Sequence, residues 1–174
     1  SIHKSIPNDQ LRHDPAKVTL PPYHPDTPEM RHDWAQYYDK IEDLDKQVSK
    51  ILQELEDAGL AENTIVGYYG DHGGVVARSK RFVYESGTRV PMIWRFPKKY
   101  EHLAPAKPNS RLNQLVSFVD LAPSVLSLAG TPIPKSPKGT AFLGKQSAAP
   151  REYVHLFRGR MDERIDMVRA VRDQ

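Results

Sequence analysis

The sequence of 174 residues contains no cysteine. Without cysteine the chain cannot form disulfide bonds, zinc–thiolate sites or a thiol nucleophile. This absence leaves the cellular compartment open, because an oxidising environment permits disulfides without requiring them. The sequence also has no apolar run close to the roughly 20 residues that a membrane-spanning helix needs. We therefore expect no membrane span in this chain.

The chain also lacks a strong excess of one charge. It has 25 Lys and Arg against 22 Asp and Glu, a net charge of +3 with His counted as neutral. Nucleic-acid-binding proteins usually carry a basic face or a long basic run. Here the densest basic stretch runs only from Arg78 to Arg81. We therefore expect no nucleic-acid partner. At 39% hydrophobic residues, the chain is apolar enough to bury a core.

The clearest secondary-structure pattern is a long helix. Residues 1–26 carry five of the 15 prolines and predict an extended surface loop. At Thr27 and Pro28 a capping side chain is followed by a proline suited to a first helical turn. Apolar residues then recur every three or four positions and predict an amphipathic helix over 28–57, which Gly59 can end. We expect this helix to pack on a sheet through Trp34, Tyr37, Ile41, Leu44, Val48 and Leu52.

The rest of the chain predicts an α/β fold, because strand-like and helical runs alternate. Residues 64–69 are β-branched and aromatic, and their continuous apolar character favours a strand covered on both faces. Residues 131–150 are rich in proline and predict a loop outside the core. The other expected elements are a strand at 90–96, a helix at 124–129, and strands at 153–157 and 167–171.

Candidate chemistry is concentrated where the 64–69 strand ends. In open α/β sheets, ligands bind at the carboxyl ends of strands. Asp71 and His72 stand at such an end, followed by Gly73 and Gly74. A carboxylate next to an imidazole can bind a metal ion. The same residues could also form a solvated turn, because Asp and Gly are common in turns.

Additional residues at fixed spacing extend this motif. Lys80 comes nine residues after Asp71, and the run Tyr84-Glu85-Ser86-Gly87-Thr88-Arg89-Val90-Pro91 follows it. The motif from Asp71 to Pro91 resembles that of the metal-dependent sulfatases of the alkaline phosphatase superfamily. Two later segments, Val119–Leu126 and Met167–Arg172, resemble the same family. The resemblance runs from about residue 20 to the end. Within the family, Leu20–Tyr23 resembles the heparan N-sulfatase-like branch.

The resemblance implies the fold and the domain organisation. It implies a fragment of the alkaline-phosphatase-like sulfatase fold, a mixed or parallel sheet with flanking helices. Residues 1–150 would be the C-terminal half of the catalytic α/β domain. Residues 151–174 would start a small C-terminal β subdomain. We therefore expect the chain to be an internal part of a longer protein.

The resemblance also implies roles for individual residues. Asp71 and His72 would bind a divalent metal, and Lys80 would contact the substrate sulfate. Calcium is the usual ion of the family, but an imidazole suits Mn²⁺ or Zn²⁺ better than Ca²⁺, so these remain alternatives. His3 stands near the position of a substrate-contacting histidine. We expect the other histidines to be surface or loop residues: His13, His24, His32, His102 and His155.

The further motif residues are expected to be structural: Tyr84, Glu85, Gly87, Arg89, Pro91 and Asp120. Gly87 would supply a tight turn, and Arg89 would pair with a carboxylate to hold its loop. Asp120 would cap the helix that holds Pro123 in its first turn.

The nucleophile of the family is a formylglycine made from Cys or Ser in a motif of the N-terminal half, and this chain contains no Cys. We expect it in an N-terminal half outside these residues, together with further acidic metal ligands. Because calcium takes six to eight oxygen ligands, Asp71 and His72 alone cannot form a tight site. The chain by itself should therefore be inactive.

Three functions remain open from the sequence. The first is hydrolysis of sulfate esters or sulfamates, in a small-molecule or glycan sulfate substrate. The second is a phosphodiesterase or phosphonate hydrolase on the same metal framework. The third is a non-catalytic module that binds polyanions, which the basic pI near 9.0 would suit. By resemblance the protein would be periplasmic, extracellular or lysosomal; the sequence does not indicate its oligomeric state.

Overall fold

The structure is a computed structural model that describes residues 5–134 and 138–173. The chain divides into two compact units. Ser1–Ala61 with Tyr68–Met92 forms the first unit, and Glu62–Gly67 with Ile93–Gln174 forms the second. The predicted domain boundary at residue 150 stays a prediction. None of the helices among the described residues is long and apolar enough to cross a membrane.

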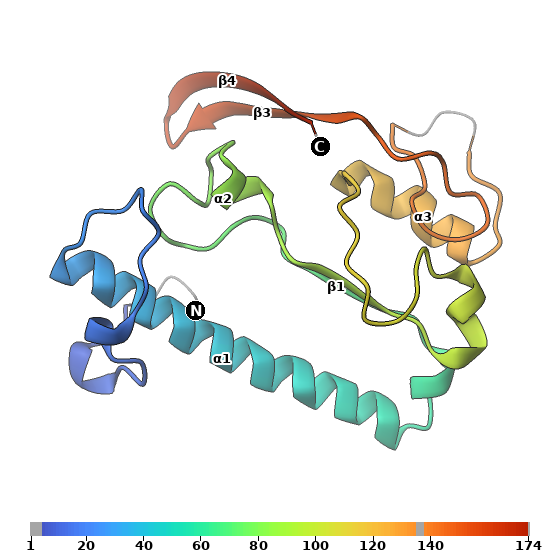
Figure 1. Ribbon diagram of the computed structural model, residues 1–174, viewed down its shortest axis with the longest axis horizontal. Coiled ribbons are helices and arrows are strands. Elements are labelled where there is room, and N and C mark those ends of the chain that lie inside the picture. The colour runs from blue at the N-terminus through green and yellow to red at the C-terminus, as the bar shows by residue number, and fades with distance from the viewer. Residues whose placement is uncertain (1–4, 135–137, 174) are drawn as a thin grey trace. The chain divides into compact units, whose positions relative to one another are not determined.

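The first unit contains the long helix α1, Pro28–Asp57, which is unbroken in Figure 1. Thr27 Oγ1 accepts a hydrogen bond from the Met30 amide at 3.3 Å, which caps the helix at its N-terminus. Gly59, with a φ of 68°, follows the last turn in the left-handed conformation. The bounds predicted from the sequence are confirmed at both ends.

The burial of α1 differs from the prediction. Its buried residues are Ala35 and Asp39, whereas Ile41 and Leu44 of the expected apolar stripe are 43% and 40% exposed. Residues 5–26, the described part of the proline-rich segment, explain why Ala35 and Asp39 are buried. Arg31 of α1 donates hydrogen bonds to the carbonyls of Ala16 and Val18 in this segment. This segment therefore folds back on the N-terminal half of α1. The stripe prediction is wrong for Ile41 and Leu44.

An aromatic cluster joins this segment to α1. His24 lies in a loop as expected, but its side chain is buried. Trp34 Nε1 donates to His24 Nδ1 at 2.9 Å, so the ring proton is on Nε2. Nε2 can therefore donate to the Ala77 carbonyl, 2.9 Å away. His24 thus connects α1 to the loop that follows β1.

Two strands, β1 (Val66–Tyr69) and β2 (Met92–Arg95), pair with each other. Both are shorter than the predicted strands. Their residues alternate between half-buried and exposed, and Tyr69 is 47% exposed, so the prediction of a strand covered on both faces is wrong for the described residues. Gly67 permits close packing, because a Cβ there would lie 2.7 Å from the Trp94 ring.

The second unit contains α3, Leu121–Leu128, which begins three residues before the predicted helix. Its core includes residues that were assigned to a loop outside the core. Ala141, Phe142 and Leu143 are all buried, and the Phe142 amide donates to Ser124 Oγ at 2.9 Å. The prediction for this part of 131–150 is wrong, because three consecutive residues pack on α3 without forming a regular element.

The C-terminal residues form an antiparallel hairpin of β3 (Tyr153–Met161) and β4 (Arg164–Asp173), as Figure 1 shows. The two expected strands are confirmed, and both are longer than predicted. The register is irregular between Arg158 and Arg160. An ion pair of 2.5 Å between Arg158 and Asp166 connects the strands.

Candidate active site

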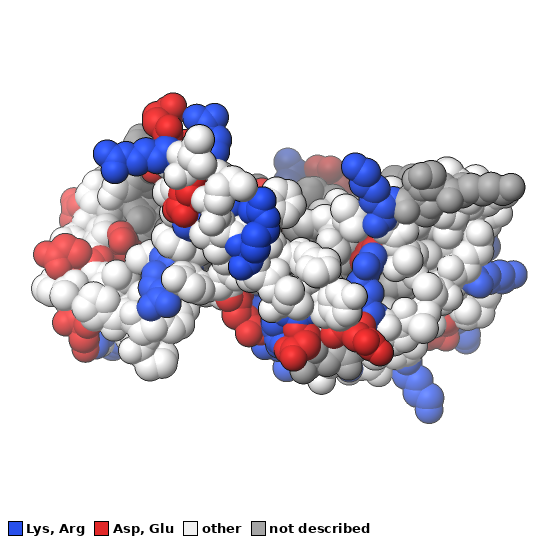
Figure 2. Space-filling model, turned by 90° about the horizontal axis from the view of Figure 1, so that it is seen from above, with Lys and Arg blue, Asp and Glu red and all other residues white. Residues whose placement is uncertain are grey.

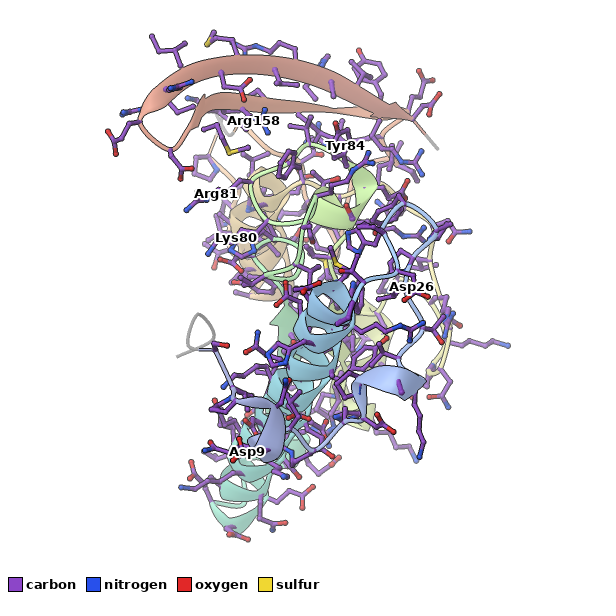
Figure 3. All side chains as sticks on the ribbon, turned by 90° about the vertical axis from the view of Figure 1, so that its left-hand side faces the viewer. Asp9, Asp26, Lys80, Arg81, Tyr84 and Arg158 are labelled. Atoms are coloured by element: carbon purple, nitrogen blue, oxygen red, sulfur yellow. The ribbon has the colours of Figure 1, made fainter. Side chains whose placement is uncertain are left out.

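The loop between β1 and β2 carries three of the predicted site residues, Asp71, His72 and Lys80. It includes a short helix, α2, at Glu85–Thr88. A hydrogen bond of 3.1 Å from the Gly70 amide to the Pro91 carbonyl closes its base. Figure 3 labels Lys80 and Arg81 on this loop. We call residues 70–91 the site loop.

Asp71 and His72 lie together at the start of the site loop. His72 Nε2 is 3.4 Å from Asp71 Oδ2, and the Asp71 side chain is 86% exposed. His72 Nδ1 lies 2.7 Å from the Gly73 carbonyl oxygen. Because a carbonyl only accepts, Nδ1 carries the proton of the neutral ring and Nε2 keeps its lone pair. A carboxylate and a free imidazole nitrogen are thus presented side by side.

This arrangement fits part of a metal site. Histidine ligands commonly donate their other ring N–H to a backbone carbonyl, which orients the ring as seen for His72. Within the described part of the chain, however, no three His, Asp or Glu side chains are grouped so that they could hold a metal ion. Asp71 and His72 can therefore contribute two donors, and a complete site needs donors from elsewhere.

Lys80 lies further along the site loop. Its side chain is partly buried and lines a hollow of about 250 Å³. The other residues of this hollow are Asp33, Val75, Val76, Ala77 and Arg81. The Lys80 amide donates to the Gly74 carbonyl at 3.1 Å, which fixes the backbone of Lys80 relative to the residues after His72. Asp33 could not be identified from the sequence, because an acidic residue on a helix usually faces solvent.

Two serines hold the site loop closed. Ser79 Oγ donates to the Ser86 carbonyl at 2.6 Å, and Ser86 Oγ donates to the Arg78 carbonyl at 2.7 Å. The Gly73 amide adds a hydrogen bond of 2.9 Å to the Gly87 carbonyl. These reciprocal contacts join the residues around Lys80 to α2. They were not predicted, because serine is common in loops of every kind.

Gly87 and Arg89 can be compared with their predicted roles. Gly87 lies inside α2, where a Cβ would be 2.3 Å from the carbonyl oxygens of Ser79 and Phe82. Its amide donates to the Tyr84 carbonyl at 2.9 Å, which closes the single turn of α2 and agrees with the predicted tight turn. The absence of a Cβ also permits close packing of backbone on backbone. Arg89 pairs with Glu85 at 3.3 Å, which confirms a carboxylate partner. Both side chains of this pair are largely exposed, so it contributes little stability.

The remaining predicted residues lie apart from this loop. His3 is outside the described residues, so its role stays a prediction. Asp120 is 2% exposed and accepts hydrogen bonds from the amides of Ser117 and Thr140 at 2.9 and 2.8 Å. It also pairs with Arg151. Its side chain does not cap α3. Because three separate segments meet at this carboxylate, Asp120 is a structural residue of the second unit.

A buried carboxylate that the sequence analysis missed lies in α1. Asp39 is fully buried and accepts from the amides of Arg12 and His13 at 2.9 and 3.1 Å. His13 Nδ1 lies 2.7 Å from the same carboxylate. Burial by itself raises the pKa of Asp39, but these hydrogen bonds and the Arg12 charge outweigh it and hold the pKa below its usual range.

Comparison with known proteins identifies the family. The family model described as "Sulfatase" matches residues 9–131. A relative from Formosa agariphila, an "Ulvan-active sulfatase", is 45% identical over 91% of this chain. The chain belongs to the sulfatase family. The human "N-sulphoglucosamine sulphohydrolase" is 33% identical over 70% of this sulfatase chain. The chain spans only 26% and 23% of these two relatives.

A solved structure supports the sulfatase fold. The structure of BT4656 in complex with its substrate D-glucosamine-2-N,6-O-disulfate matches 83% of this chain with a TM-score of 0.69 and 25% identity. The match covers 31% of that protein. On the face of the sulfatase chain shown in Figure 2, basic and acidic side chains are interspersed.

Proposed function

We propose that this chain forms part of a metal-dependent sulfatase that hydrolyses sulfate esters or sulfamates. One observation carries the proposal. In a chain of the sulfatase family, His72 presents the Nε2 lone pair 3.4 Å from the Asp71 carboxylate, at the end of β1. A solvated turn would require neither this proximity nor the Nδ1 contact that fixes the ring.

The substrate class that we propose is a sulfated glycan. The names of the relatives support it, since one is an ulvan-active sulfatase and another an N-sulphoglucosamine sulphohydrolase. The solved structure was obtained with a disulfated glucosamine. These names favour sulfuryl over phosphoryl substrates. Because the chain spans about a quarter of those relatives, the activity of the whole protein is part of the proposal.

In this proposal Asp71 and His72 hold one side of a divalent cation. Calcium is the first candidate, and Mn²⁺ or Zn²⁺ are alternatives because His72 offers nitrogen. When bound, the ion would supply Lewis-acid chemistry at the sulfate oxygens. The formylglycine nucleophile would come from outside these residues. A location in the periplasm, the extracellular space or the lysosome remains a prediction.

Lys80 is the residue that we propose to contact the sulfate. A compact ammonium group can offset the negative charge that develops as the sulfuryl group leaves. The Gly74 contact and the serine pair hold the Lys80 backbone in one place. A preorganised charge stabilises a transition state more than one that must first be ordered.

Lys80 variants of the intact protein test the proposal. Lys80→Ala should slow turnover of a sulfated aryl or glucosamine substrate by at least about 100-fold, the scale for one preorganised electrostatic contact. Lys80→Arg should keep part of the rate, because the charge remains although its geometry changes. Lys46→Ala, which removes an exposed lysine from α1, is the matched control and should match the wild type. Wild-type turnover in Lys80→Ala would contradict the assigned role.

A further inference from the structure

The first unit contains a second hollow, of about 450 Å³, which none of the assigned roles uses. It is lined by Tyr23, Arg78, Tyr84, Glu85, Ser86 and Arg89. These residues come from the proline-rich segment and from two parts of the site loop. Tyr23 and Tyr84 are 44% and 48% exposed, so both rings are accessible. We call this the tyrosine hollow.

Arg78 is the main polar group of the tyrosine hollow. Its guanidinium carbon lies 5.4 Å from the centre of the Tyr23 ring and 4.7 Å from that of Tyr84. The Arg78 guanidinium contacts these two rings. It forms no ion pair or hydrogen bond with any of the residues that the structure describes, 5–134 and 138–173. A guanidinium has five N–H donors, which fit the paired oxygens of a carboxylate or sulfate.

The backbone of Arg78 is held before any ligand arrives. Its carbonyl accepts from Ser86 Oγ at 2.7 Å, and the preceding carbonyl, of Ala77, contacts the buried His24 ring at 2.9 Å. Arg78 itself adopts a φ of 62°, which non-glycine residues rarely do. Such a conformation persists where the surroundings impose it, and it is common at ligand-binding positions.

The charge of the hollow favours an anion. Its charged residues are two arginines and one glutamate, and Arg89 pairs with that glutamate, Glu85, at 3.3 Å. Arg78 is therefore left as the uncompensated charge. Ligand sites typically combine apolar or aromatic walls with a few polar groups that fix orientation. Two accessible tyrosine rings beside one cation match that description.

We propose that the tyrosine hollow binds an anionic sugar unit of a sulfated glycan, with its anionic group on the Arg78 guanidinium and its ring against the tyrosines. The ligand class rests on the proposed sulfatase function. The hollow would then select the glycan by a unit other than the sulfate that is cleaved. Sulfate and uronate carboxylate share the required chemistry, since both offer two oxygens to an arginine.

The test is binding of a heparin-derived tetrasaccharide to the intact protein, measured by calorimetry. Arg78→Gly removes the side chain, and glycine adopts a φ of 62° without strain, so the loop conformation is preserved. Arg78→Gly and Tyr84→Ala should each weaken binding at least about tenfold, the scale of a charge-assisted or cation–π contact. Tyr84→Phe and the charge control Lys46→Gln should bind as the wild type does.

Modified ligands identify the anionic group. If the Arg78→Gly effect disappears with the desulfated tetrasaccharide, Arg78 contacts a sulfate. If it disappears with the carboxyl-reduced ligand, Arg78 contacts a carboxylate. An effect that persists with both assigns Arg78 to either anion. Wild-type affinity in both Arg78→Gly and Tyr84→Ala, or an equal loss in Lys46→Gln, would overturn the proposal.

A separate assay keeps the two proposals distinguishable. Turnover of 4-nitrophenyl sulfate by the wild-type protein reports only on the sulfatase function. If the protein has no turnover but the binding effects are found, the proposed function fails and the tyrosine hollow stands. If turnover is present and the binding effects are absent, the tyrosine hollow fails and the function stands. Thermal melting of each variant verifies that it is folded.

Discussion

His72 is the residue whose surroundings most directly suggest its chemistry. In the neutral ring, the Nδ1 contact with the Gly73 carbonyl, at 2.7 Å, puts the lone pair on Nε2, next to Asp71. The sequence supplied the two adjacent residue types and their place after a strand. It could not supply the tautomer, because that depends on how the backbone turns at Gly73.

Asp71→Ala in the intact protein should weaken binding of a divalent cation at least about tenfold, because one charged donor is lost. Stability without metal should change by no more than about 0.5 kcal/mol, because the Asp71 side chain is 86% exposed. Titration with Ca²⁺ and Mn²⁺, followed by calorimetry and a thermal melt, measures both. Asp45→Ala, at an exposed position of α1, is the control. Unchanged affinity in Asp71→Ala would mean that Asp71 is not a ligand.

Asp39 shows the opposite case, a carboxylate that the sequence pattern disguises. It follows two tyrosines in a polar stretch of α1, yet it is fully buried. The partners that make this possible, Arg12 and His13, are 27 and 26 residues earlier in the chain. Helical periodicity contains no information about such distant partners, so this site could not be predicted.

Asp39→Asn should destabilise the intact protein by about 1–3 kcal/mol near pH 7, because a charged acceptor becomes a neutral one. The folded-state pKa of Asp39 is lowered, so its contribution is present above the unfolded pKa and is lost as pH falls through the folded value. The difference in melting temperature between wild type and variant should therefore shrink below about pH 4. A difference that stays constant down to about pH 2 would contradict this, with Asp45→Asn as the control.

At the level of elements, sequence reasoning succeeded where structure is local. The bounds of α1 follow from Thr27, Pro28 and Gly59, which act on their immediate neighbours. The positions of β3 and β4 likewise followed from short apolar runs. The core segment Ala141–Leu143 is apolar, but it was missed because it lies in a proline-rich stretch that predicts a loop and because its burial depends on α3.

The site loop depends on glycines that no periodicity predicts. At Gly87 an added Cβ would lie 2.3 Å from two backbone carbonyl oxygens, and backbone cannot move aside as a flexible side chain can. Gly159, in β3, has no atom within 4 Å of the same position. The two residues therefore form a matched pair for the same substitution.

Gly87→Ala should destabilise the site loop by about 1–3 kcal/mol, the range for overpacking a close contact. It should also reduce turnover of the intact protein, because the Ser79 and Phe82 carbonyls that must shift flank Lys80. Limited trypsin digestion after Lys80 and Arg81 measures opening of the loop directly. Gly159→Ala should digest and melt as the wild type does. If the two alanine variants behave alike, close packing is not what requires glycine at 87.

At the scale of the whole molecule, the proposed metal site has too few donors in this chain to be complete. Asp71 and His72 are the donors that the site loop brings together, and the described residues offer no group of three. The matched part of the chain covers only 26% and 23% of two relatives. Complete metal coordination and the nucleophile would therefore both require residues beyond those that the structure describes.

Residues 1–174 expressed alone should bind Ca²⁺ at least about 100-fold more weakly than the intact protein, because two donors replace the six to eight oxygens of a full site. They should hydrolyse 4-nitrophenyl sulfate at no more than the background rate, since the proposed formylglycine nucleophile lies outside these residues. Calorimetry and a discontinuous assay on both proteins measure these quantities. Circular dichroism should show the helical signal of the 30-residue α1, which separates an incomplete site from an unfolded chain. Turnover by the isolated, folded chain equal to that of the intact protein would place the whole catalytic site within residues 1–174. It would contradict a metal site whose remaining ligands lie outside these residues.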